Sequence, residues 1–199
     1  IDIGRFRDGT VIWPFQITRI LRRVTPFVVE LFRVPFQQQE QIRDYIVRGL
    51  PRCVGGRIDA TGIGVQFAES ALQTFGEAMA PVKITSEWYR LQTPPVKAAF
   101  EDDAIAIPRD SEILSDFRTI KEVKGVAQPP SLRLPSVTGG KRHGDAAIAC
   151  ILAYEATLFP HGEVDYRSAR VGFGGDDDAS DIWRGERDDF LGDRRDGLW

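Results

Sequence analysis

The sequence is poor in the residues that form cross-links and lacks long apolar runs. It has two cysteines and one methionine among 199 residues. Cys53 and Cys150 lie far apart and form no CxxC pair, which excludes a disulfide scaffold and is typical of a reducing, cytoplasmic compartment. The longest mainly apolar stretch, residues 146–159, contains Tyr154 and Glu155 and is shorter than the roughly 20 residues that cross a bilayer. We therefore expect neither a secreted disulfide-rich protein nor a membrane span.

What is present is typical of one folded domain followed by a segment of different character. Hydrophobic residues make up 42% of the chain and aromatic residues 10%, which is enough to fill a core. The 26 basic and 29 acidic residues nearly balance. However, residues 1–159 are mildly basic, whereas residues 160–199 are acidic and rich in Gly and Asp. We expect a domain over residues 1–159 and an acidic, flexible tail over residues 160–199.

The chain begins with three β-prone runs. Residues 1–4 and 10–16 lie on either side of a turn that contains Asp8 and Gly9. Residues 27–34 form a third run that is bounded by prolines. This pattern predicts an antiparallel meander of three strands.

Helical and strand patterns alternate in the middle of the chain. Apolar spacing predicts helices over residues 37–50 and 65–78, with Tyr45 on the apolar face of the first. A strand over residues 57–60 precedes the second helix and is joined to it by a glycine-containing loop. Strand, glycine loop and helix make a βα unit, which places Asp59 at the carboxyl end of its strand.

The second half is expected to add a strand, a peripheral hairpin and two helices. Alanine, isoleucine and leucine cover nearly all sides of residues 146–156, which predicts a helix buried against a sheet, with Asp145 in its first turn. The fold class is therefore α/β, with a mixed central sheet flanked by helices. Its antiparallel strands 1–3 are followed by parallel strands 4–5. The other expected segments are a strand over residues 81–85, a helix over residues 95–103 that begins after two prolines, and a hairpin of residues 104–107 with 117–123.

Three aspartates lie at the edges of apolar elements. In a sheet ordered 3-2-1-4, the strands of Asp2 and Asp59 are neighbours, and the last helix brings Asp145 over the same edge. Three converging carboxylates repel one another unless a cation neutralises them. Mg²⁺ and Mn²⁺ prefer such oxygen ligands, and two ions about 3.5–4 Å apart can activate water and stabilise a leaving oxygen. The pattern thus indicates a two-metal phosphodiesterase site.

Each acid also has an ordinary structural use. Taken alone, Asp59 is more simply a cap of the following turn, and Asp145 more simply a charge at a helix N-terminus. Asp2 is compatible with a solvated position at the end of the chain. Asp8 is most simply a turn former, and the alternative is a carboxylate that supports the site from farther away. Spacing alone leaves both interpretations open.

The motifs together resemble the nuclease domain of the large terminase subunit of tailed bacteriophages, in particular its Mu-like branch. They occur in the expected order over residues 1 to about 157. The resemblance does not extend to the tail. The motifs are DIGR, RD and TVIW in residues 2–13, RIDATGIG in residues 57–64 and RHGDAA in residues 142–147.

This resemblance implies a ribonuclease H-like fold and a two-metal acidic site that cuts double-stranded DNA during phage assembly in the host cell cytoplasm. Asp2, Asp59 and Asp145 match the metal-binding acids of the family, and Asp8 matches an acidic position that often accompanies the first motif. His143 is similar to the histidine of a His-x-Asp arrangement in resolvase-like relatives. There it would orient the phosphate or shuttle a proton, and a plain loop histidine is the alternative.

Basic residues near the acids are expected to contact DNA phosphates. Lys141 and Arg142 precede the third acid, and Arg5 and Arg7 lie in the first hairpin. A second basic cluster in residues 19–23 is more simply a solvated face.

No ATP-binding loop is visible. Gly139, Gly140 and Lys141 are followed by Arg142, which does not match GxxxxGK[ST]. We therefore expect the nuclease domain alone. The resemblance implies as its partners double-stranded DNA, the N-terminal ATPase motor domain of the same full-length protein, the portal and the small terminase subunit. The alternatives are another ribonuclease H-like nuclease, such as a junction resolvase or a hybrid ribonuclease, and a non-catalytic docking domain whose tail binds the portal or small subunit.

Overall fold

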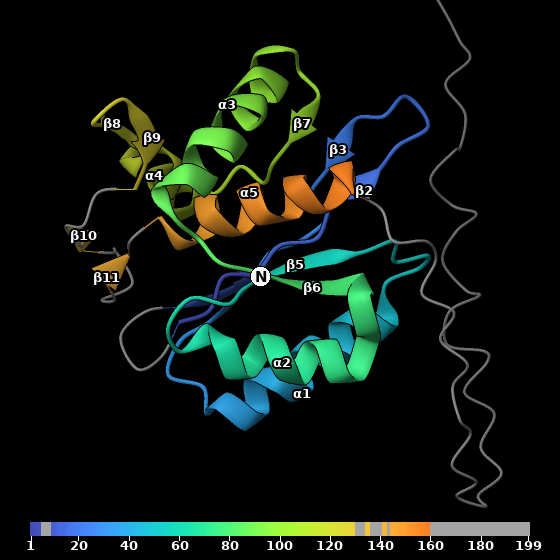
Figure 1. Ribbon diagram of the computed structural model, residues 1–199. Helices are drawn as coiled ribbons and strands as arrows, with labels where there is room; N and C mark the ends of the chain where they lie inside the picture. Colours follow the sequence, from blue (N-terminus) through green and yellow to red (C-terminus); the bar gives the residue numbers. More distant parts are fainter. Residues whose placement is uncertain (5–8, 130–133, 136–140, 143, 160–199) are drawn as a thin grey trace, which may run out of the picture. The chain divides into compact units, whose positions relative to one another are not determined.

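The computed structural model describes residues 1–4, 9–129, 134–135, 141–142 and 144–159. The predicted division at residue 159 and the acidic tail over residues 160–199 therefore lie outside the described part of the chain. In Figure 1, two paired strands, β5 (Gly56–Asp59) and β6 (Met79–Val82), lie between two groups of helices. One group is α1 (Phe36–Gly49) with α2 (Gly64–Phe75), and the other is α3 (Ser86–Glu101), α4 (Ser111–Thr119) and α5 (Asp145–Leu158). The α/β class is confirmed.

The first residues of the chain connect two pairs of strands. β1 (Thr10–Ile12) pairs antiparallel with β4 (Val29–Leu31), whereas β5 pairs parallel with β6. Asp2 exchanges backbone hydrogen bonds with Val11 of β1, at N···O distances of 3.0 and 2.9 Å. The Asp59 N–H of β5 donates to the Ile1 carbonyl at 2.9 Å. Residues 1–3 thus lie between β1 and β5.

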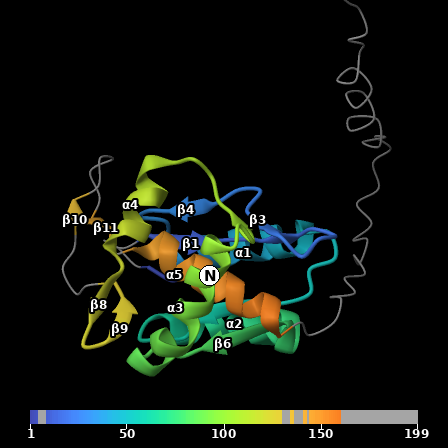
Figure 2. The same ribbon diagram turned by 90° about the horizontal axis from the view of Figure 1, so that it is seen from above.

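The predicted hairpin of residues 104–107 with 117–123 is wrong. β7 (Ile105–Ala106) instead pairs parallel with β3 (Arg23–Val24), which is itself antiparallel to β2 (Gln16–Ile17). The hairpin forms between β8 (Lys121–Val123) and β9 (Val126–Gln128), because Lys124 and Gly125 both adopt positive φ in the turn between them. Figure 2 shows this hairpin and α4 at the end of the molecule where α5 begins.

The expected start of a helix after Pro94 and Pro95 is also wrong. Both prolines lie inside α3, which begins nine residues before Pro95, at Ser86, where the Thr85 hydroxyl accepts the Trp88 N–H at 3.2 Å. Prolines within a helix leave carbonyls one turn earlier without their usual donor. Here the helix continues because Trp88, before the two prolines, and Val96 and Ala99, after them, are buried in one apolar cluster.

Packing on the two sides of the strands differs in polarity. α5 is buried on nearly all sides, as its composition predicts. A short 3₁₀ helix, η1 (Gly76–Ala78), follows α2. On α1 the prediction for Tyr45 is wrong, since its side chain is 81% exposed. The buried row is instead Gln39, Arg43 and Val47, because the Arg43 guanidinium donates to the Phe67 carbonyl at 2.9 Å and lies over the Phe67 ring.

A further small hairpin consists of β10 (Leu134–Pro135) and β11 (Lys141–Arg142). Cys53 and Cys150 are both free thiols, in agreement with the sequence. Among the helices of the described residues, none has both the length and the apolar content to cross a membrane.

Candidate active site

Asp59 lies at the carboxyl end of β5, where the strand turns sharply into α2. Its Oδ1 accepts the Thr61 N–H at 2.8 Å, and its side chain is largely buried. Burial raises the pKa of Asp59, while hydrogen bonds from Thr61 lower it in part. The turn-capping use considered from the sequence is therefore real, and it fixes the carboxylate at the end of the strand.

The close approach of α2 to Asp59 depends on Gly64. A Cβ added at Gly64 would lie 2.2 Å from the Asp59 carbonyl oxygen. No other residue type fits this approach without a backbone shift. The RIDATGIG pattern thus fixes both the acid and the helix that packs behind it.

Asp2 is buried on the neighbouring segment. It is 7% exposed, so the expectation that it is solvated is excluded. Burial raises the pKa of Asp2 well above its ordinary value, and the negative charges of Asp145 and Asp59 raise it further. This mutual effect places the three carboxylates in one electrostatic neighbourhood, although they are separated widely in sequence.

Asp145 occupies the first turn of α5 and is also buried, at 7% exposure. The N-cap is Gly144, which has φ +88°. Because glycine has no side chain, α5 begins without a side-chain cap from its own N-cap residue. The Ala146 N–H donates instead to Oδ2 of Asp116 in α4, at 3.0 Å. The start of α5, and with it Asp145, is held by a residue 30 positions away in sequence.

Tyr89 is a fourth member of this neighbourhood that sequence reasoning missed. It lies in the first turns of α3, and its ring packs edge-on against Trp88 with centroids 5.0 Å apart. Burial raises the pKa of the Tyr89 hydroxyl, and the charges of Asp2, Asp59 and Asp145 add to the shift. One signal in the sequence was available. Tyr89 follows β6 closely, and the last residue of β6, Val82, lies opposite Asp59 in the β5–β6 register.

The three aspartates share a neighbourhood but not a preformed coordination shell. Within residues that the structure describes, no group of three or more His, Cys, Asp or Glu side chains is clustered closely enough to hold a metal ion. Like charges that face one another across a site repel, and this repulsion favours separated carboxylates. The predicted metal-binding role of Asp2, Asp59 and Asp145 therefore stays a prediction.

Most of the predicted partners of these acids cannot be placed. Arg5, Arg7, Asp8 and His143 lie outside the described residues. Lys141 and Arg142 belong to β11, but their side chains are likewise not described.

The cluster in residues 19–23 does have described contacts. Arg22 forms an exposed ion pair with Asp103 at 2.6 Å. Arg23 donates to the Thr157 hydroxyl at 2.7 Å and lies over the Tyr154 ring. These contacts join the β2–β3 hairpin to its surroundings, so Arg22 and Arg23 have a structural use within the fold instead of forming a plain solvated face.

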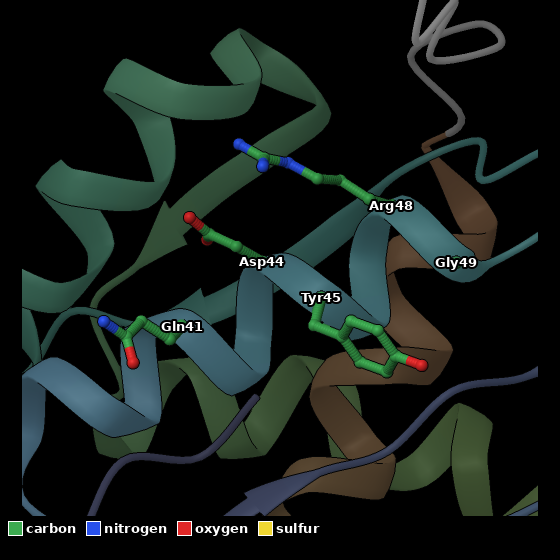
Figure 3. Close-up of a pocket in the computed structure, with 5 residues that line it drawn as sticks. All are labelled: Gln41, Asp44, Tyr45, Arg48 and Gly49. Atoms are coloured by element: carbon green, nitrogen blue, oxygen red, sulfur yellow. The ribbon is translucent and has the colours of Figure 1, made fainter. Parts of the chain in front are cut away.

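A surface hollow lies elsewhere, on α1. Figure 3 shows that its lining side chains all come from this one helix. None of the three aspartates lines the hollow, which is therefore separate from the acids. The lining residues are Gln41, Asp44, Tyr45, Arg48 and Gly49.

Two curated proteins are clearly similar in sequence. The Mu-like prophage FluMu protein gp28 of Haemophilus influenzae is 35% identical over 167 residues, which cover 83% of this chain and 33% of that protein. The probable terminase, large subunit gp28, of Escherichia phage Mu is 39% identical over 158 residues, which cover 78% and 29%. No family model matches the chain.

Two solved structures are similar in backbone. The large terminase nuclease from thermophilic phage G20c with bound zinc has a TM-score of 0.49 and 15% identity, and the same nuclease with bound cobalt has 0.46 and 13%. Each match covers 77% of this chain and 85% of the other. The sequence matches, at 35% and 39% identity, agree with the resemblance found in the motifs. The chain is homologous to the gp28 proteins of phage Mu and of a Mu-like prophage, and it spans about a third of the length of these relatives.

Proposed function

We propose that the chain is the metal-dependent endonuclease part of a DNA-packaging large terminase subunit, with a ribonuclease H-like fold. It would hydrolyse phosphodiester bonds of double-stranded DNA with little sequence preference, in the cytoplasm of the host cell. The observation that carries the proposal is the burial of Asp2, Asp59 and Asp145 in one electrostatic neighbourhood, in a chain homologous to a large terminase subunit.

The chemistry of these side chains suits a hard divalent cation. Carboxylate oxygens are the ligands that Mg²⁺ and Mn²⁺ prefer. Burial and mutual repulsion raise the pKa of Asp2 in the absence of a cation, so a bound ion would remove an existing electrostatic cost. Asp2, Asp59 and Asp145 would hold the metal, most simply as two ions. When bound, the ions would supply an activated water and stabilise the leaving oxygen.

The chain's own residues would divide the remaining work. Thr61 and Gly64 fix the Asp59 carboxylate and its backbone. Asp8 would support the acids from farther away, and His143 would orient the phosphate or move a proton. Lys141, Arg142, Arg5 and Arg7 would neutralise DNA phosphates, which gives affinity without base preference.

The partners follow from the proposed role in packaging. Sustained contact with DNA would depend on the ATPase motor domain in the remainder of the full-length protein. The portal and the small terminase subunit are the other proposed partners.

The direct test is incubation of the purified chain with supercoiled plasmid in Mg²⁺ or Mn²⁺. We expect loss of supercoils with either ion, and none with EDTA or with Asp59→Asn. Asp103→Asn is the matched control, because Asp103 is an exposed aspartate whose described ion pair is with Arg22. Cleavage that persists in Asp59→Asn would contradict the assigned site.

Cleavage assays with different substrates distinguish a packaging nuclease from the alternative ribonuclease H-like enzymes. A packaging nuclease should cut linear duplex DNA, whereas preference for a four-way junction or for an RNA/DNA hybrid would indicate one of the alternatives.

A further inference from the structure

Asp116 is a buried acid that the proposed chemistry does not use. It lies in α4 and is 1% exposed. Its Oδ2 accepts the Ala146 N–H at 3.0 Å, one residue after Asp145. Burial of a carboxylate is costly unless hydrogen bonds compensate for it, so its place at this helix end needs a physical reason.

The N-terminus of α5 supplies that reason. The first N–H groups of a helix have no partners within the helix, and a carboxylate there also interacts favourably with the helix dipole. Because Gly144 has no side chain, α5 takes its cap from α4. The cap is thus a tertiary contact between two helices.

The surroundings hold Asp116 in this position. The Thr119 hydroxyl donates to the Asp116 carbonyl at 2.6 Å. The same hydroxyl oxygen would lie 2.7 Å from a Cβ added at Gly144. Ile113 of α4 packs in one apolar cluster with Ala146 of α5. The last turn of α4 and the first turn of α5 are therefore fitted to each other on both sides of the cap.

We propose that Asp116 is a positioning residue, which caps α5 from α4 and thereby holds Asp145 in place relative to Asp2 and Asp59. The proposal deepens the proposed nuclease function and rests on it for its consequence, which is metal binding. Residues that orient metal ligands typically change metal affinity by about 10–100-fold when they are removed. Asp116 itself would not contact the substrate or the metal.

The test compares Asp116→Ala, Asp116→Asn and Asp110→Ala in the full chain. Asn keeps a side-chain oxygen that can accept the Ala146 N–H, so it should restore part of what Ala loses. Asp110 is the matched control, because it caps α4 itself by accepting the Glu112 and Ile113 N–H groups at 2.8 and 3.0 Å. Its loss removes a cap of the same chemistry from the opposite end of α4.

Two readouts are needed, and neither requires cleavage. Hydrogen exchange reports the protection of the Ala146 amide relative to amides in the middle of α5, and the signal of free Mn²⁺ in electron paramagnetic resonance reports metal binding. For Asp116→Ala we expect protection of Ala146 to fall about tenfold and Mn²⁺ affinity to fall by a similar factor. Asp116→Asn should recover part of both, and Asp110→Ala should change neither.

Several results would overturn the proposal. Unchanged protection at Ala146 in Asp116→Ala would mean that the cap does not hold the first turn. Equal loss along all of α5, or equal loss in Asp110→Ala, would indicate general destabilisation. If Asp116→Ala does not fold, two other variants test the same role. Wild-type protection of the Ala146 amide in Asp116→Asn, together with loss of that protection in a folded Asp116→Ser variant, would support it. Absence of Mn²⁺ binding by the wild type would count against the proposed function, while the exchange data would still decide the role of the cap.

Discussion

The two halves of the acidic site are held in different ways. Asp2 and Asp59 lie on adjacent strand segments, where backbone hydrogen bonds and the Thr61 turn fix them. Asp145 lies at the start of a helix whose cap comes from Asp116, in another helix. The strand half depends mainly on backbone pairing between strand segments, whereas the helix half depends on how α4 and α5 pack. The halves should therefore respond to different substitutions.

The largest effect is expected from removing a carboxylate from either half. Asp59→Asn and Asp145→Asn should each lower the rate of plasmid cleavage at least about 100-fold, because each removes a charged ligand that the reaction needs. The double variant should be little worse than either single variant, since the acids act as a unit. Cleavage rates in Mn²⁺ measure this. Wild-type activity in one single variant would show that this half does not hold metal.

A second substitution addresses the far end of α5. Glu155 forms a buried ion pair with Arg57 of β5 at 3.5 Å and accepts the Trp88 indole N–H at 2.8 Å. Glu155→Ala should lower the free energy of unfolding by about 3 kcal/mol, because it leaves a buried guanidinium without this partner. Urea unfolding measures the loss, and Glu155→Gln, which keeps an oxygen for Trp88, should lose less. Equal losses in both variants would assign the effect to the charge alone.

The strand half is tested by Gly64→Ala. The added methyl group collides with the Asp59 carbonyl, so we expect a loss of about 1–3 kcal/mol in unfolding free energy together with slower cleavage. Gly49→Ala is the control, because a Cβ at Gly49 meets no atom within 4 Å and should be tolerated. Similar results for the two variants would contradict the close approach of α2 to Asp59.

The smallest effect concerns the pH dependence of the metal-free chain. The folded state raises the pKa of Asp2 above its ordinary value of 3.8, so it binds a proton that the unfolded chain has already lost. The penalty is absent at lower pH and grows as pH rises through the folded pKa, so stability falls in that direction. Asp2→Asn should remove this part of the pH dependence. Urea unfolding in EDTA, from about pH 4 to pH 8, compares it with Asp103→Asn. If the free energy of unfolding depended on pH in the same way in the wild type and in Asp2→Asn, this would contradict the raised pKa of a buried Asp2.

The sequence predicted best what depends on local pattern. The strand that ends at Asp59, the glycine loop and the apolar helix that begins at Asp145 all follow from alternation, turn residues and composition. Asp116 was missed because its role exists only once α4 packs against α5. Its position three residues after the buried Ile113, on the same helix face, was the available signal.

Tertiary packing also explains the errors in the fold. The proline pair predicts a helix start, but apolar contacts on both sides of it keep α3 continuous. The spacing of apolar residues placed Tyr45 on the buried face of α1. Arg43 is buried there instead, because its guanidinium donates to the Phe67 carbonyl and lies over the Phe67 ring. In both places a contact that is distant in sequence overrides the local preference.

The most direct test of the proposed acidic metal site is a crystal structure of the chain with Mn²⁺, in which the ions are located by their anomalous scattering. We expect Mn²⁺ bound to carboxylate oxygens of Asp2, Asp59 and Asp145, with the start of α5 still capped by Asp116. Absence of Mn²⁺ from these three side chains at a concentration that supports cleavage, or Mn²⁺ held only by other residues, would contradict the proposed site.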